Sequence, residues 1–211
     1  MPSRVRSAQT LVHWAVATLA LEGERESGDL HLVQPVTDGV LIAVVDGLGH
    51  GEEAAAAARL AVSTLERYAE EPPLSLLQRC HVALKGSRGV VLNLARFDAP
   101  RGTMTWLGVG NVEGVLHHVD WSERSDRASL ITRGGIVGSE VPALQAAVIP
   151  VNAGDTLVFA TDGIGSGFLS DVSVREEPQR LADVILARHG KGTDDALVLV
   201  ARYVGAVGMT A

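Results

Sequence analysis

Three short and strongly apolar segments constrain the fold of this chain more than any other feature. They are VLIAVV at residues 40–45, TLVFA at residues 156–160 and ALVLVARY at residues 196–203. A half-buried strand alternates apolar and polar residues, whereas an unbroken apolar run of this length is typical of a strand covered on both faces. We therefore expect β-sheets that are packed between other layers.

The rest of the chain supplies enough strands and helices for such layers. Strand patterns and turn residues predict further strands at residues 12–21, 30–34, 90–97, 103–108, 114–119, 130–132 and 146–150. Helical patterns occur at residues 52–68, 74–85 and 177–189. Turn dipeptides such as Asp38-Gly39 link many of the strands, which favours antiparallel pairing. The sequence predicts an α+β fold, an αββα sandwich of two mainly antiparallel sheets flanked by helices, in a single domain over residues 1–211 with its core at about 10–204.

Composition excludes several classes of protein. The formal net charge is −7 and no run of basic residues occurs, which argues against nucleic-acid binding. The single cysteine, Cys80, excludes an intramolecular disulfide and a cysteine-based zinc cluster, and its helical context predicts a buried structural thiol. No segment approaches the length of a membrane span and no signal peptide is recognisable, so we expect a cytoplasmic protein.

Acidic residues stand at the ends of the apolar strands. Asp46 follows the first apolar run, Asp162 follows the second, and Asp194-Asp195 precede the third. Asp29 precedes the strand predicted to begin at residue 30. Carboxylates that converge at rigid strand ends repel one another unless a cation neutralises them, and hard oxygen ligands suit Mg²⁺ or Mn²⁺.

Other interpretations of these residues are weaker. Asp-Gly is a common turn dipeptide, and Asp38-Gly39 is expected to be only a turn, but three acidic groups at apolar strand ends favour a site. The glycines at 47, 49 and 51 do not match a dinucleotide-binding motif, because Glu52 takes the place of its third glycine. No nucleophile motif of the G-x-S-x-G type occurs. His117-His118 is expected to place one ring inside and one outside rather than both on a metal.

Five motifs in order resemble a known family. They are Ser27-Gly28-Asp29, Val45-Asp46-Gly47-x-Gly49-His50-Gly51, Gly108-Val109-Gly110-Asn111, Thr161-Asp162-Gly163 and Asp194-Asp195. This set resembles the metal-dependent Ser/Thr protein phosphatases of the PPM type, and within them the bacterial SpoIIE/RsbX-like branch. Within that branch it is most similar to the stressosome phosphatase RsbX. The resemblance covers about residues 10–204.

The resemblance implies two Mn²⁺ or Mg²⁺ ions that activate a water for attack on phosphorus. Asp46 would bridge both ions, and the carbonyl of Gly47 and the carboxylate of Asp29 would serve one of them. Asp162 and Asp194 would serve the other, with Asp195 behind them, although a one-residue shift would exchange Asp194 and Asp195. The site residues implied are therefore, in chain order, Asp29, Asp46, Gly47, Asp162, Asp194 and Asp195.

The chain also departs from the pattern of its larger relatives. Leu48 stands where they carry a histidine that can act as a general acid, and His50 is the nearest histidine. Arg25, four residues before Asp29, is a candidate for holding the substrate phosphate, with a solvated turn residue as the alternative. The segment at 121–128 is expected to be a loop, either a short flap that selects substrates or plain surface.

The implied function is a phosphoserine/phosphothreonine protein phosphatase that acts on regulatory phosphoproteins. By family analogy, the partner would be a phosphorylated STAS-domain regulatory protein of a stressosome-type switch. The alternative is a non-catalytic phosphatase-like module that only binds a partner. The complete acidic set disfavours that alternative, because a scaffold has no need to hold repelling carboxylates together.

Overall fold

The computed structural model describes residues 11–119, 127–129, 133–173 and 175–205, and it contains two five-stranded antiparallel sheets. The first sheet has the strand order β1 (Val12–Leu19), β10 (Ala196–Tyr203), β9 (Thr156–Ala160), β6 (Glu113–His117) and β7 (Arg127–Ser129). The second has the order β2 (Asp29–Val36), β3 (Gly39–Gly47), β4 (Val90–Asp98), β5 (Thr103–Val109) and β8 (Ala147–Pro150).

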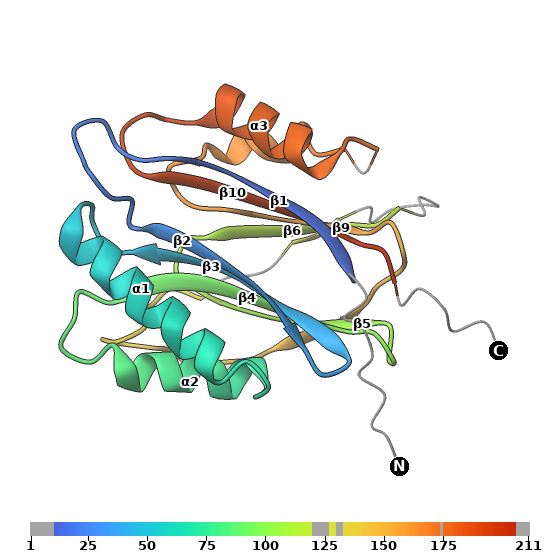
Figure 1. The fold of residues 1–211 in the computed structure, drawn as a ribbon, viewed down its shortest axis with the longest axis horizontal. Coiled ribbons are helices and arrows are strands. Elements are labelled where there is room, and N and C mark those ends of the chain that lie inside the picture. The colour runs from blue at the N-terminus through green and yellow to red at the C-terminus, as the bar shows by residue number, and fades with distance from the viewer. Residues whose placement is uncertain (1–10, 120–126, 130–132, 174, 206–211) are drawn as a thin grey trace, which may run out of the picture.

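Helices cover the outer face of each sheet (Figure 1). Helices α1 (Glu52–Arg67) and α2 (Pro73–Ala83) pack on the second sheet. Helix α3 (Pro178–His189) and the short 3₁₀ helix η1 (Ser166–Ser170) pack on the first. The αββα sandwich predicted from the sequence is confirmed.

The layers explain why the strand at 40–45 is apolar throughout. Ile42 and Val44 of β3 point into the apolar layer between the two sheets. Leu41, Ala43 and Val45 point the other way, into the layer under α1 and α2. All five side chains are inaccessible to solvent, so neither face of the strand tolerates a polar residue.

Most predicted elements are present, with shifts at their ends. Strand β1 ends at Leu19 rather than at residue 21, and β2 extends over Asp29–Val36 rather than 30–34. The predicted loop at 121–128 is wrong at its end, because residues 127 and 128 belong to β7, while 121–126 lie outside the described residues. The strand predicted at 130–132 also lies outside them.

Two residue-level expectations concern the core. Cys80 is fully buried, and burial raises the pKa of its thiol to about 12, which confirms a structural rather than a reactive cysteine. Of the adjacent histidines, His117 is buried and His118 is partly exposed, as expected for successive residues at a strand end. Among the described residues, no helix is both long and apolar enough to cross a membrane.

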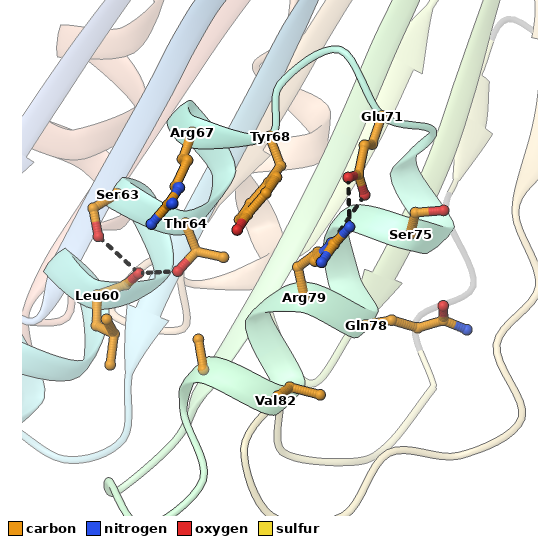
Figure 2. A pocket seen from close by; sticks show the side chains of 11 residues that line it. Leu60, Ser63, Thr64, Arg67, Tyr68, Glu71, Ser75, Gln78, Arg79 and Val82 are labelled. Atoms are coloured by element: carbon orange, nitrogen blue, oxygen red, sulfur yellow. Dashed lines mark hydrogen bonds and ion pairs between the residues drawn. The ribbon is translucent and has the colours of Figure 1, made fainter.

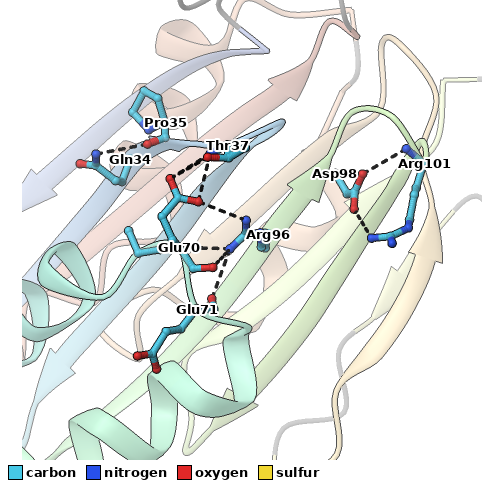
Figure 3. A network of polar contacts seen from close by, with 9 residues as sticks. Gln34, Pro35, Thr37, Glu70, Glu71, Arg96, Asp98 and Arg101 are labelled. Atoms are coloured by element: carbon cyan, nitrogen blue, oxygen red, sulfur yellow. Dashed lines mark hydrogen bonds and ion pairs between the residues drawn. The ribbon is translucent and has the colours of Figure 1, made fainter.

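Arg96 of β4 ties the end of α1 to the second sheet (Figure 3). Its Nη1 donates to the backbone carbonyl oxygens of Ala69, Glu70 and Glu71 at 3.0–3.2 Å. These carbonyls follow the last turn of α1, where the helix itself provides no donor. The Glu70 carboxylate also accepts from the backbone amide and the hydroxyl of Thr37, so one cluster joins α1, β4 and the β2–β3 turn.

We predict that Arg96→Met lowers the free energy of unfolding by about 1–3 kcal/mol, because it leaves carbonyl oxygens without their charged donor. Arg101→Met is the matched control, since Arg101 is exposed and, among the residues that the structure describes, pairs only with Asp98 three positions away. The control is expected to change stability by less than about 0.5 kcal/mol. Chemical denaturation of both variants tests this, and equal losses would contradict the role given to Arg96.

Candidate functional site

The acidic residues singled out in the sequence come together at one end of the sandwich. Asp29 and Asp46 are direct partners in the antiparallel register of β2 and β3. Asp162 follows β9, and Asp194 precedes β10 in the other sheet. The electrostatic influence of Asp162 and Asp194 reaches both Asp29 and Asp46. Both sheets therefore contribute carboxylates to one cluster, which we call the acidic cluster: Asp29, Asp46, Asp162, Asp194 and Asp195.

A buried hydrogen bond joins the two sheets beside this cluster. The hydroxyl of Thr161 donates to Oδ2 of Asp29 at 2.7 Å. The same hydroxyl oxygen accepts the backbone amide of Leu197 at 2.8 Å. Thr161 thus fixes the Asp29 carboxyl relative to β10, although the two residues are far apart in sequence.

Asp195 holds the loop that leads into β2. Its Oδ1 accepts the backbone amide of Leu21 at 2.8 Å, and its Oδ2 accepts that of Gly28 at 2.7 Å. Both carboxylate oxygens are therefore engaged with backbone donors. The side chain of Asp195 is almost fully buried, whereas that of Asp194 is partly exposed.

Asp162 is held from two sides. Its Oδ2 accepts from the side-chain amide of Asn111 at 2.7 Å. Its backbone carbonyl oxygen accepts from Nζ of Lys191 at 2.5 Å. The next residue must be glycine, because a Cβ at Gly163 would lie 2.0 Å from the carbonyl oxygen of Asp195. The Asp162 turn is therefore packed directly against the Asp194-Asp195 segment.

Three of these residues, Asn111, Thr161 and Lys191, had no role predicted from the sequence. Asn111 and Thr161 both lie within motifs that carried the family resemblance, but only the structure shows what their side chains contact. The signal available in the sequence was their position, since each stands beside a strand end that bears or faces an acid. Lys191 had no such signal.

The cluster raises the pKa values of its inner carboxyls. Burial raises the pKa of Asp29 to about 7, with Asp195, Asp162 and Asp194 adding repulsion and the Thr161 hydrogen bond opposing the rise. Burial raises the pKa of Asp46 to about 8, and repulsion from Asp29 is the next cause. Without a cation, the pair keeps part of its protons at neutral pH.

The donor set fits hard divalent cations. Among the described residues, no three or more His, Cys, Asp and Glu side chains form a group that could hold a metal ion as they stand. Mg²⁺ does not need a group of three or more side-chain ligands, because it keeps several waters and is usually held by one or two carboxylates. The cluster offers oxygen donors alone, and a cation would offset the burial and the repulsion that raise the pKa values of Asp29 and Asp46.

Ion pairs line the loops around the cluster. His50 Nδ1 lies 2.6 Å from Oε1 of Glu24, Arg59 pairs with Glu26 at 2.5 Å, and Arg88 pairs with Glu53 at 2.5 Å. These pairs join the β1–β2 loop to His50 in the loop before α1 and to Arg59 of α1, and they join Glu53 of α1 to Arg88 in the loop before β4.

Two residues from the sequence analysis lie apart from these pairs. Arg25 is exposed and has no hydrogen bond or ion pair within the described part of the chain. Leu48 packs against the apolar layer between the sheets, so its position provides no polar group to the cluster.

One surface groove lies away from the acidic cluster. It has a volume of about 770 Å³ and lies between the exposed sides of α1 and α2 (Figure 2). Its only carboxylate, Glu71, is paired with Arg79, whose guanidinium also stacks on Tyr68. None of the acidic cluster lines this groove, so the chemistry predicted from the sequence does not belong to it.

Comparison with known proteins decides the family. A family model described as stage II sporulation protein E (SpoIIE) matches residues 37–204, which is most of the chain. The chain belongs to the SpoIIE family. This membership confirms the resemblance seen in the five motifs. The matched segment contains four of the five acids in the cluster, and Asp29 lies just before it.

The similarity to an individual relative is consistent with membership of the SpoIIE family. This chain is 32% identical over 109 residues to the phosphoserine phosphatase RsbX of Bacillus subtilis (strain 168). That alignment covers 52% of this chain and 53% of RsbX, so it spans about half of the relative's length.

Solved structures show the same fold. A chain from a structure of the bacterial stressosome, described as a modular system adapted to control secondary messenger signalling, has a TM-score of 0.82 at 31% identity. The match covers 90% of this chain and 99% of that one. RsbX crystallised in complex with magnesium has a TM-score of 0.80 at 20% identity, over 91% of this chain and 95% of that one.

We predict that the metal-free protein loses stability as the pH rises from about 4 to about 8. In this window the unfolded carboxyls of Asp29 and Asp46 are ionised while the folded ones, with pKa values of about 7 and about 8, retain protons. The folded state then binds more protons, so stability falls with rising pH and levels off above the folded pKa values.

Thermal unfolding in chelator across this pH range measures the effect. Asp46→Asn removes the group with the higher pKa, so the Tm of this variant should fall less steeply than that of the wild type. Asp38→Asn, in the β2–β3 turn, should follow the wild type. Parallel curves for the wild type and Asp46→Asn would show that Asp46 is ionised at low pH in the folded protein.

Proposed function

We propose that this chain is a metal-dependent phosphoserine/phosphothreonine protein phosphatase that acts on regulatory phosphoproteins. The observation that carries the proposal is the pairing of Asp29 and Asp46 across β2 and β3, close to acids of the other sheet, with both pKa values raised. Membership of the SpoIIE family and similarity to the phosphoserine phosphatase RsbX support it.

In this proposal the acidic cluster holds two Mg²⁺ or Mn²⁺ ions. Asp46 would contribute to both ions, Asp29 and the carbonyl oxygen of Gly47 would hold one of them, and Asp162 and Asp194 would hold the other. The contacts of Asp195 support its exclusion from the ligand set, because both of its oxygens already accept backbone amides. This favours Asp194 over Asp195 as the direct ligand.

Bound divalent ions lower the pKa of a water and neutralise phosphoryl oxygens, which is the chemistry that phosphomonoester hydrolysis needs. The chain's own residues keep the carboxylates in position for this. Thr161 orients Asp29, Asn111 orients Asp162, and Asp195 holds the backbone at Gly28, next to Asp29. Positions fixed in this way cost little reorganisation when ions and substrate arrive.

The protein substrate is proposed by analogy with relatives of this chain. We propose a phosphorylated STAS-domain protein of a stressosome-type switch as the substrate, and similarity to a chain of the bacterial stressosome supports this choice. The competing function is a phosphatase-like module that binds such a partner without hydrolysis. Turnover distinguishes the two.

We predict that hydrolysis of p-nitrophenyl phosphate requires Mn²⁺ or Mg²⁺ and stops in excess chelator. Asp46→Asn should lower kcat by at least about 100-fold at saturating metal, since it weakens both proposed ion sites together. Asp38→Asn is the matched control, because it makes the same change in an acid remote from the cluster, and it should keep wild-type activity. Full activity in chelator, or in Asp46→Asn with an unchanged fold, would contradict the metal mechanism.

We further predict that substrate selection depends on docking of a folded partner. The proposed ligands recognise only a phosphate and its metals, so they do not distinguish one phosphoserine from another. The kcat/KM for an intact phosphorylated STAS domain should exceed that for a short peptide with the same phosphosite by at least about tenfold. Equal values would mean that local sequence alone is recognised.

A further inference from the structure

Lys191 is attached to the segment that carries Asp162. It lies in the turn between α3 and β10, and its side chain is exposed. Its Nζ donates to the carbonyl oxygen of Asp162 at 2.5 Å, and its backbone amide donates to the carbonyl oxygen of Gly163 at 2.9 Å. Since both its backbone and its ammonium group are fixed there, the positive charge has a defined place at the edge of the acidic cluster.

This charge is not cancelled by a carboxylate. An ammonium group has three N–H donors, and among the described residues only one of them is used, on a carbonyl oxygen with a partial charge. Two arginines described above differ, because Arg59 of α1 is paired with Glu26, and Arg88 in the loop before β4 is paired with Glu53. Lys191 therefore presents a full positive charge and free donors to solvent beside the cluster.

A phosphoryl dianion needs such a cation at this site. The four carboxylates proposed as ligands carry four negative charges, which two divalent ions only balance. Asp195 adds a fifth negative charge nearby. A positive side chain at the edge of the acidic cluster would then supply the additional attraction for the phosphoryl dianion. A lysine ammonium group binds phosphate well as a point charge.

We infer that Lys191 binds the phosphoryl group of the substrate, and the phosphate released from it, at the Asp162 edge of the site. The inference deepens the proposed function and rests on it. It is independent of Arg25, which belongs to the β1–β2 loop on the Asp29 side of the cluster. Lys191 is thus a substrate-binding residue that the family motifs do not include.

Three variants test this inference. Lys191→Met removes the charge but keeps the length of the side chain, and Lys191→Arg keeps the charge. Lys85→Met is the matched control, because Lys85 is the only other lysine and is an exposed residue just after α2. For each protein, with Mg²⁺ saturating, we would measure the KM for p-nitrophenyl phosphate, the inhibition constant of inorganic phosphate, and the rise in Tm caused by phosphate.

Lys191→Met should raise both the KM and the phosphate inhibition constant by about tenfold, as expected for loss of a hydrogen bond to a charged group. It should also abolish most of the phosphate-induced rise in Tm, which requires no turnover. Lys191→Arg should restore most of each effect, and Lys85→Met should match the wild type.

Other results would overturn the inference or separate it from the proposed hydrolysis. If Lys191→Met changes the Tm or the Mg²⁺ activation constant but leaves the phosphate inhibition constant and phosphate protection unchanged, Lys191 only supports the Asp162 turn and the inference is overturned. Absence of phosphate protection in the wild type also overturns it. If the wild type is inactive but its phosphate protection depends on Lys191, the proposed hydrolysis fails while the phosphate site stands.

Discussion

Repulsion between carboxylates that the fold forces together is the constraint on which the rest of this structure depends. Asp29 and Asp46 face each other in the register of β2 and β3, and burial removes much of the water that would screen them. Burial is the largest cause of their raised pKa values, and repulsion from neighbouring acids adds to it. A fold that keeps these carboxyls together must hold them in fixed positions. In this sandwich, hydrogen bonds from both sheets do so.

These supports cross between distant parts of the chain. Thr161 links Asp29 to β10, and Asp195 links the start of β10 to the β1–β2 loop. Asn111 holds the carboxylate of Asp162 from the end of β5. Each contact joins a strand end to another strand or loop, so the two sheets cannot shift against each other without moving the acids.

The sequence predicted much of this fold because its strongest signals are local. The apolar run at 40–45 implies a strand buried on both faces, and β3 has that environment. The acids near the strand ends were likewise visible in the chain, because each of them stands next to a run of apolar residues or at the start of a predicted strand. The family motifs then placed these acids in a recognised order.

Contacts between residues that are distant in the chain could not be predicted from the sequence pattern. The bond from Lys191 to Asp162 depends on how the turn after α3 packs against the turn after β9. Which of Asp194 and Asp195 is the proposed metal ligand depends on which carboxylate accepts hydrogen bonds from the backbone amides of Leu21 and Gly28. The end of the predicted loop at 121–128 was misplaced because a three-residue edge strand, β7, has too few residues to show a period.

Our central claim is that buried acids from two sheets, which keep protons because ionisation is costly there, form one divalent-cation site. Calorimetric titration of the protein with Mn²⁺ at about pH 7, in two buffers with different heats of ionisation, tests it most directly because it counts both ions and protons. We predict that two ions bind with net release of protons from Asp29 and Asp46. Absence of binding, or binding with no proton release, would contradict it.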